Sequence, residues 1–314
     1  MALSLQQYAE HLDERGEPQP AGPEPKPVPA KPHAPPLGVR AAICGGRGVA
    51  WLAAADPELL PADAVMRKIA FDKTVSEFKM WPSMPRKPGE PGEVLTHLVA
   101  EARERLVARL IGGGGGEPSF GMVWRGVLDR LLQREYVYDA GFFGALDEYA
   151  EKIALYCQRA ACGMAALPGA RDTLRLLAAQ GVKVGLRANG QTATPALLTR
   201  AFAAQGPVSS LGELFAPALT WWSHELGSPI ETERGWAEVE RSVAAAGLRP
   251  EEVVCVGCDV ARDVLPARRR GFRTALLAAD RASVKVRSAQ LKDDATKPDA
   301  LLTEFSQLAL LCAA

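Results

Sequence analysis

The sequence has little of several features that would assign it to particular classes of protein. No apolar run approaches the roughly 20 residues needed to span a bilayer. Its 37 basic residues balance 37 acidic ones, so charge gives no reason to expect binding to nucleic acid or to an anionic membrane. The polar N-terminal residues do not resemble a secretory signal. We therefore expect no nucleic acid or membrane as a partner, and a cytoplasmic location.

Histidine and cysteine are too scattered to predict a metal site. The four histidines show no metal-ligand spacing, and only His224 lies near a predicted strand end. Among the six cysteines, Cys255 and Cys258 have the spacing of a redox or zinc half-site. Because alternation along a strand would turn Cys255 into the core, we favour buried, reduced thiols in a cytoplasmic protein.

The segment Val253–Asp263, VVCVGCDVARD, is the most informative part of the chain. Its apolar run stops at Gly257, and a helical pattern follows. A buried strand that leads through glycine into a helix places polar side chains at the carboxyl edge of a parallel sheet. The segment resembles a motif of the haloacid dehalogenase-like (HAD) hydrolases, VGDSxxxD, in which both acids hold Mg²⁺. Here Cys258 takes the first acidic position and Asp263 the second.

The resemblance extends over residues 167–280 as an ordered series of motifs. Residues 167–190 are similar to the second motif, whose strand should end in Ser or Thr before Asn-Gly. Ala188 stands at that position, followed by Asn189. Residues 223–236 are similar to the third motif, whose Lys position falls at Ile230, give or take one residue.

The first motif of the family, FDxxGTL, matches best at residues 39–52, VRAAICGGRGVAWL. Aligned on Gly48, the nucleophilic Asp becomes Gly45 and the acid/base Asp becomes Arg47. Neither residue can attack a phosphoryl group or relay a proton as a carboxylate does. A divalent cation would be left with Asp263 and Asp259. The resemblance thus implies an HAD-like fold without catalytic residues and without Mg²⁺.

Two functions from different classes follow from these motifs. The favoured hypothesis is a catalytically inactive HAD-like protein that serves as a binding or scaffolding module for an unidentified small molecule or protein. The alternative is a HAD-family hydrolase of phosphatase or dehalogenase type with a noncanonical site. It would use Cys258 as a thiolate, or Asp259 and Asp263 to hold Mg²⁺.

Arg47 suggests what fills the former metal site. The family fold places the strand that ends at Gly257 beside the first strand. The Arg47 guanidinium should then approach Asp263 or Asp259, because a partly buried carboxylate without a cation is costly. The alternative is that Arg47 points to solvent from a glycine-rich loop.

The architecture that we expect is α/β, a doubly wound, mostly parallel sheet with an inserted helical cap. The strands should lie near residues 39–44, 182–187, 217–222, 253–257 and 273–277, with helices on both faces. The core should comprise residues 38–52 and 167–314, and the cap residues 53–166. Residues 299–312 should form a helix that packs through its leucines.

Residues 1–37 are interpreted as an arm with two parts. Residues 1–16 predict a short amphipathic helix that docks on its own chain or on a partner. The proline-rich residues 17–36 predict an extended, mobile spacer, and the alternative is a ligand for a PxxP-binding domain. In the cap, the glycine run 112–116 predicts a flexible loop. Residues 71–93 predict a loop packed through its aromatic side chains, and the alternative is the lining of a binding cleft.

Overall fold

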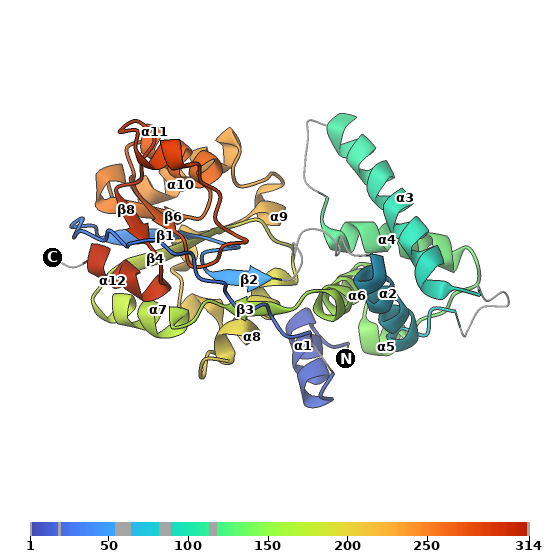
Figure 1. The fold of residues 1–314 in the computed structure, drawn as a ribbon. Coiled ribbons are helices and arrows are strands. Elements are labelled where there is room, and N and C mark those ends of the chain that lie inside the picture. The colour runs from blue at the N-terminus through green and yellow to red at the C-terminus, as the bar shows by residue number, and fades with distance from the viewer. Residues whose placement is uncertain (1, 18–19, 54–63, 82–88, 113–117, 313–314) are drawn as a thin grey trace. The chain divides into compact units, whose positions relative to one another are not determined.

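The computed structural model describes residues 2–17, 20–53, 64–81, 89–112 and 118–312 (Figure 1). The chain divides into two compact units. The helical unit comprises Met1–Gly22, Ala53–Gly163 and Gly190–Leu197. The sheet unit comprises Pro23–Leu52, Met164–Asn189 and Leu198–Ala314. Among the described residues, no helix is long and apolar enough to cross a membrane.

The sheet unit is built on six strands, and each strand pairs in parallel with its neighbours. Their order is β5-β4-β1-β6-β7-β8. The strands are β1 (Ala41–Gly45), β4 (Lys183–Ala188), β5 (Thr220–Trp222), β6 (Val253–Gly257), β7 (Arg273–Leu277) and β8 (Ala300–Leu302). β1 and β6 are buried at every residue, which explains their continuous apolar sequences. Two shorter strands, β2 (Trp51–Ala53) and β3 (Met164–Ala166), pair with each other.

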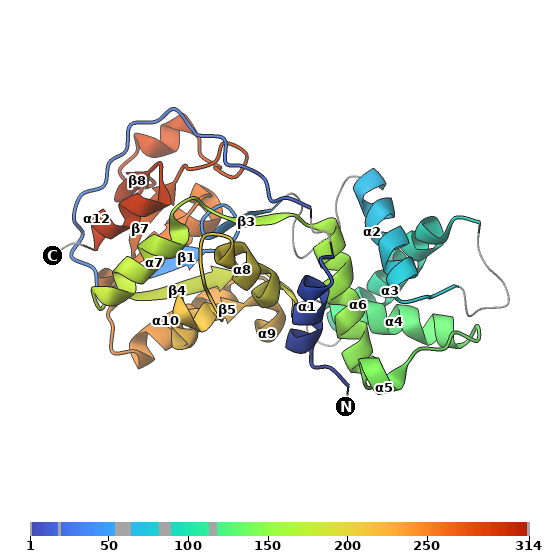
Figure 2. The same ribbon diagram turned by 90° about the horizontal axis from the view of Figure 1, so that it is seen from below.

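Helices cover both faces of the sheet, as Figures 1 and 2 show. α7 (Ala170–Ala179) and α12 (Leu308–Leu311) lie on one face, and α10 (Glu233–Ala245) and α11 (Leu265–Arg269) on the other. The chain runs from β1 outward to β4 and β5, and then returns to β6 and β7 on the other side of β1. This reversal is the doubly wound topology, and the expected fold class is confirmed. Further helices are α8 (Thr194–Ala203), α9 (Ser223–Leu226), and 3₁₀ turns at Leu211–Glu213, Pro217–Leu219, Pro250–Glu252, Ser288–Leu291 and Phe305–Gln307.

The core between the sheet and α10 is apolar. It includes Ile43 of β1, Trp236 and Val239 of α10, and Cys255 of β6, which confirms that Cys255 points into the core. All six cysteines are free, and four of them are buried.

The helical unit contains α1 (Leu5–Glu14), α2 (Ala64–Glu77), α3 (Pro91–Gly112), α4 (Phe120–Leu132), α5 (Ala140–Phe143) and α6 (Leu146–Ala161). α6 is buried along most of its length. Phe78, Met80 and Trp81 are buried as well, so this part of residues 71–93 is packed through its aromatic side chains. The loop expected over residues 71–93 is wrong at both ends, because residues 71–77 belong to α2 and residues 91–93 to α3. Arg86, Lys87 and the glycines at 113–116 lie outside the described residues.

The helix expected over residues 299–312 is wrong. Residues 300–302 instead form β8, which pairs with β7 through Leu276↔Leu301, and only Leu308–Leu311 are α-helical. A short apolar run such as Ala-Leu-Leu fits either a strand or a helix by its pattern. Pairing with the exposed edge of β7 decides in favour of the strand.

The proline-rich segment is extended, but the expectation that it is a mobile spacer is wrong for its described part. The Lys26 amide donates to Asp280 Oδ1 at 3.0 Å, and its carbonyl accepts from the Arg281 amide at 2.8 Å. His33 exchanges two backbone bonds of 2.8 Å with Leu301 of β8. Prolines at 32, 35 and 36 lack the N–H that would lengthen this pairing. The segment therefore covers the edge strand of the sheet.

Candidate functional site

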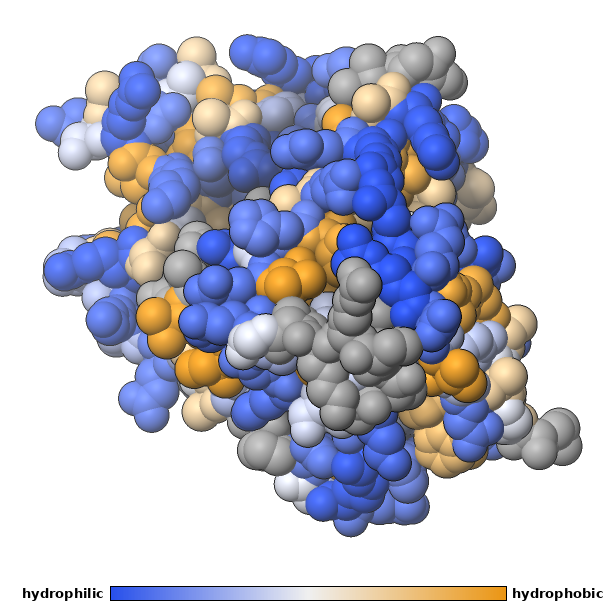
Figure 3. All heavy atoms as spheres, turned by 90° about the vertical axis from the view of Figure 1, so that its right-hand side faces the viewer, coloured by the Kyte–Doolittle hydropathy of each residue, from blue (hydrophilic) through white to orange (hydrophobic). Residues whose placement is uncertain are grey.

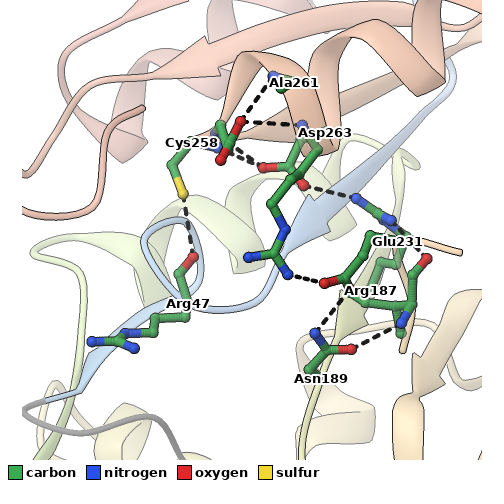
Figure 4. A network of polar contacts seen from close by, with 10 residues as sticks. Arg47, Arg187, Asn189, Glu231, Cys258, Ala261 and Asp263 are labelled. Carbon is green, nitrogen blue, oxygen red and sulfur yellow. Dashed lines mark hydrogen bonds and ion pairs between the residues drawn. The ribbon is translucent and has the colours of Figure 1, made fainter. Parts of the chain in front are cut away.

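The carboxyl ends of β1, β4 and β6 bring the sequence motifs together. β1 lies between β4 and β6, with Gly45 opposite Arg187 and Cys44 opposite Val256. Parallel strands that end at one edge bring the residues after them into a common crevice. Residues at and after the ends of these three strands, together with Glu231 from the segment that follows α9, form the network in Figure 4.

The turn after β1 is crowded by its neighbours. Gly48 has a φ of +80°, and a Cβ on it would lie 2.7 Å from Cys258 Sγ and 2.8 Å from Ser283 Cβ. A Cβ on Gly46 would lie 2.5 Å from the Trp51 ring and 2.7 Å from Ala188 Cβ. The fully buried Trp51 also stacks on Trp222, with ring centroids 6.4 Å apart. An indole therefore fills the space next to the ends of β1 and β4.

Asp263 is the best-held acid of the site. Its Oδ2 accepts hydrogen bonds from the backbone amides of Cys258 and Asp259, both at 3.1 Å. Its Oδ1 accepts from Arg187 Nη2 at 2.9 Å. A Cβ on Gly257 would overlap the Asp263 side chain, which explains the glycine at this point of the motif.

Asp259 has a structural role at the start of the next helical turn. It precedes a π-helical turn, Val260–Val264, and its Oδ1 accepts from the amides of Ala261 and Arg262 at 2.8 and 3.1 Å. These are helix N-cap bonds, which satisfy amides that have no partner within the helix.

Arg187 supplies the positive charge of the site. It lies near the end of β4, is 3% exposed, and its guanidinium carbon sits 4.0 Å from the ring centre of Trp236. Besides its bond to Asp263, it donates from Nη1 to the Ile230 carbonyl at 3.0 Å. Burial lowers the pKa of Arg187, and the Asp263 carboxylate opposes that shift. An arginine nevertheless stays charged in proteins.

The prediction that Arg47 pairs with Asp263 or Asp259 is therefore wrong, because the cation that pairs with Asp263 is Arg187. Arg47 is exposed, and its guanidinium points away from Asp263 in Figure 4. Its carbonyl accepts a hydrogen bond from Cys258 Sγ at 3.5 Å. The charge argument for a cation at Asp263 holds, but the cation comes from β4 instead of from the β1 turn.

Asn189 and the segment around Ile230 are joined by further polar contacts. Asn189 Oδ1 accepts from the Ile230 amide at 2.8 Å, and its Nδ2 donates to Glu231 Oε2 at 2.9 Å. Glu231 also pairs with Arg262. The Ile230 side chain is buried. The residues at the second and third motif positions thus bind each other, and the amide of Asn189 is already engaged.

Cys258 is poorly suited to act as a nucleophile. Burial raises the pKa of its thiol to about 12, and the carboxylates of Asp263 and Asp259 add to the effect. A nucleophilic cysteine needs the opposite environment, which favours the thiolate near neutral pH. At pH 7 Cys258 is therefore a neutral thiol.

The residues of this crevice do not fit Mg²⁺, which requires an octahedral shell of oxygen atoms. Gly45 and Cys258 provide no carboxylate. Both oxygens of Asp263 are already bonded to Arg187 and to backbone amides. In the part of the chain that the structure describes, no group of three His, Cys, Asp or Glu side chains is arranged to hold a metal ion.

Three residues of the site did not emerge from the motifs, namely Trp51, Arg187 and Glu231. Arg187 carried a usable signal, because a charged residue within the apolar strand GLRA needs a buried partner. Trp51 and Glu231 lie within the segments that match the first and third motifs, and nothing in their spacing indicates which way their side chains turn.

Comparison with known proteins relates the fold to solved structures. No protein-family model matches the sequence, and a search of curated proteins finds no significant match. The 2-haloacid dehalogenase from Pseudomonas syringae pv. Tomato DC3000 covers 87% of this chain and 97% of its own, with 18% identity and a TM-score of 0.52.

Two further similar structures have lower TM-scores. They are the putative HAD-hydrolase YfnB from Bacillus subtilis (13% identity, 88% of this chain and 99% of its own, TM-score 0.44) and the L-2-haloacid dehalogenase from Xanthobacter autotrophicus (17% identity, 86% and 96%, TM-score 0.41). The order of the strands, the helices on both faces and the likeness to the Pseudomonas enzyme together show that this chain has the haloacid dehalogenase-like fold.

Proposed function

We propose that this chain is a catalytically inactive HAD-like protein that serves as a binding or scaffolding module, with residues 53–166 as its cap. One observation carries the proposal: the former catalytic edge is occupied by the protein's own side chains. Trp51 packs against Gly46 and Trp222, and Arg187 neutralises Asp263. Gly45 and Arg47 replace the two carboxylates on which the family chemistry depends.

The alternative hydrolase receives less support from the site. A thiolate at Cys258 is opposed by its raised pKa. A metal at Asp263 would have to displace a buried arginine that makes three favourable contacts, with Asp263, Ile230 and Trp236. The free cysteines favour a reducing compartment, so we also propose a cytoplasmic location.

The test is an assay of the full chain with Mg²⁺ and p-nitrophenyl phosphate, and in parallel with 2-chloropropionate. We expect no turnover above the rate without protein. The variants are Asp263→Asn and, as a matched control, Asp299→Asn, whose carboxylate binds Thr274 and Arg268 away from the crevice. Turnover of either substrate above the rate without protein, retained by Asp299→Asn, would refute the proposal. Dependence on Mg²⁺ and loss in Asp263→Asn would assign that turnover to a metal held by Asp263.

A further inference from the structure

The helical unit holds α1 in a groove formed by α2, α5 and α6. Figures 1 and 2 both show α1 alongside α6. Tyr8 and Leu12, four residues apart and therefore on one face of the helix, are completely buried. The Tyr8 ring contacts those of Phe78 and Phe143, with centroids 6.3 and 6.0 Å apart. Two apolar side chains thus anchor α1 in an aromatic pocket.

Glu77, at the end of α2, binds the C-terminal end of α1. Its two carboxylate oxygens accept from Arg15 Nη1 and Nη2 at 2.7 and 3.0 Å. Its Oε1 also accepts from the Tyr8 hydroxyl at 3.4 Å. A forked arginine–carboxylate pair fixes direction as well as position.

Arg159 of α6 binds the same end of α1 from the other side of the groove. Its side chain is 4% exposed, and it donates to Asp13 Oδ1 at 2.5 Å. Its Nη2 donates to the carbonyls of Leu12 and Glu17 at 3.4 and 3.0 Å. A buried guanidinium that meets the carbonyl of Leu12, in the last turn of α1, complements the negative end of the helix dipole. The groove therefore carries one acidic and one basic group, and both are matched by residues of the arm.

The free energy of docking of α1 is a balance of opposing contributions. A ten-residue helix is too short to be stable alone in water, so α1 gains its order from docking. Two buried side chains oppose the entropy lost when the arm is ordered. The carboxylate of Asp13 is 46% exposed and the guanidinium of Arg15 is 40% exposed, so water weakens both ion pairs.

We propose that this groove is a binding site for an amphipathic helix and that α1 is its resident, reversibly docked occupant. The groove recognises an aromatic residue and a leucine four positions apart, followed by an acidic residue and then a basic residue near the helix end. Val65 and Val137 are exposed apolar residues elsewhere on the helical unit, and Figure 3 shows the apolar areas of the side that it views broken by hydrophilic ones. This inference rests on the proposed function in one respect: the groove is the surface through which the proposed binding module binds.

The experiment uses the full chain with the arm released by the double substitution Tyr8→Ala/Leu12→Ala. A fluorescently labelled peptide of residues 2–17 is titrated into this variant and into the wild type, and fluorescence anisotropy is measured. We expect saturable binding to the released variant. Binding to the wild type should be at least about tenfold weaker, because its own tethered α1 competes at high effective concentration.

Matched controls distinguish specific docking of the peptide from nonspecific binding. A peptide with Gln6→Ala, which changes an exposed position, should bind as well as the original. Adding Arg159→Met to the released variant should weaken peptide binding at least about tenfold, because Asp13 and the carbonyls of Leu12 and Glu17 lose the guanidinium that binds them. A peptide that carries Tyr8→Ala/Leu12→Ala should not bind.

Two outcomes would overturn the inference. One is the absence of peptide binding by the released variant when circular dichroism shows that it is folded. The other needs no variant: if wild-type α1 amides exchange with deuterium as slowly as those of α6, α1 is a permanent part of the core. Neither result depends on phosphate or haloacid turnover, so this inference and the proposed function fail separately.

Discussion

Arg187 in the sheet unit and Arg159 in the helical unit are both nearly inaccessible guanidinium groups, and they differ in what neutralises them. Arg187 meets a carboxylate of its own unit that two backbone amides also hold. Arg159 meets the half-exposed Asp13 of the N-terminal arm. The first pair stays in place as long as the unit is folded. The second depends on a short helix that we propose to dock reversibly. Equal burial of the cation therefore belongs to a fixed ion pair in the sheet unit and to a docking site in the helical unit.

The largest expected loss in the free energy of unfolding is that caused by Arg187→Met. Without Arg187, the partly buried Asp263 carboxylate keeps its two backbone amides but loses this cation. Removal of one partner of a buried pair costs about 3–5 kcal/mol. We expect the free energy of unfolding, measured by urea denaturation, to fall by this amount.

Arg270→Met is the control for this substitution. The Arg270 guanidinium also lies over Trp236, at 5.3 Å, but its partner Glu233 is 93% exposed. The loss should be smaller than for Arg187→Met, because the exposed Glu233 carboxylate is solvated by water when its cation is removed. Equal losses in both variants would mean that packing on Trp236, and not the ion pair with Asp263, stabilises this edge of the sheet.

The reactivity of the Cys258 thiol tests whether the carboxyl edge of the sheet is chemically inert. Its pKa of about 12, against the ordinary 9.0, leaves about 100- to 1000-fold less thiolate at pH 8. Alkylation by iodoacetamide, followed residue by residue with mass spectrometry, should be slower in the native protein by that factor than in urea. Native alkylation at the rate of the unfolded chain would restore Cys258 as a candidate nucleophile.

The same pKa shift predicts the sign of a pH effect on stability. Because the pKa is raised in the folded state, the contribution of the protonated thiol is complete below pH 9 and is lost as the pH rises toward 12. The difference in unfolding free energy between wild type and Cys258→Ser should therefore shrink above pH 9. A difference that does not change with pH between 7 and 10.5 would contradict the shift.

Crowding at the end of β1 can be separated from backbone strain with two glycines. Gly48 and Gly181 both have left-handed φ angles, +80° and +77°, but only Gly48 has neighbours within reach of an added Cβ. Both Gly→Ala substitutions should cost about 1–2 kcal/mol for the left-handed backbone. Gly48→Ala should cost more, because Cys258 and Ser283 must move. Equal losses would show that the crevice is looser than its contacts suggest.

The sequence was informative where glycines and apolar runs determine the structure. β6 and β7 lie where their patterns predicted, and Asp263 lies at the predicted strand end because Gly257 admits its side chain. The pairing of charges was not predictable. It depends on which way a strand residue turns, and Arg187 reaches Asp263 across the sheet from β4. β8 was missed because pairing, not local pattern, makes it a strand.

The smallest expected effect concerns the part of the arm that attaches to the sheet unit. His33→Pro removes the amide that donates to the Leu301 carbonyl and leaves the other bond of the bridge possible. A net hydrogen bond contributes about 1 kcal/mol, so the free energy of unfolding should fall by about that amount. Hydrogen exchange at the Leu301 amide, which donates to His33, should rise, while exchange at the Leu186 amide in β4 stays unchanged. If exchange at Leu301 does not change, the proline-rich segment is held by its other hydrogen bonds, those at Lys26 and Leu37. The contrast between this firmly attached segment and the reversibly docked α1 then becomes stronger.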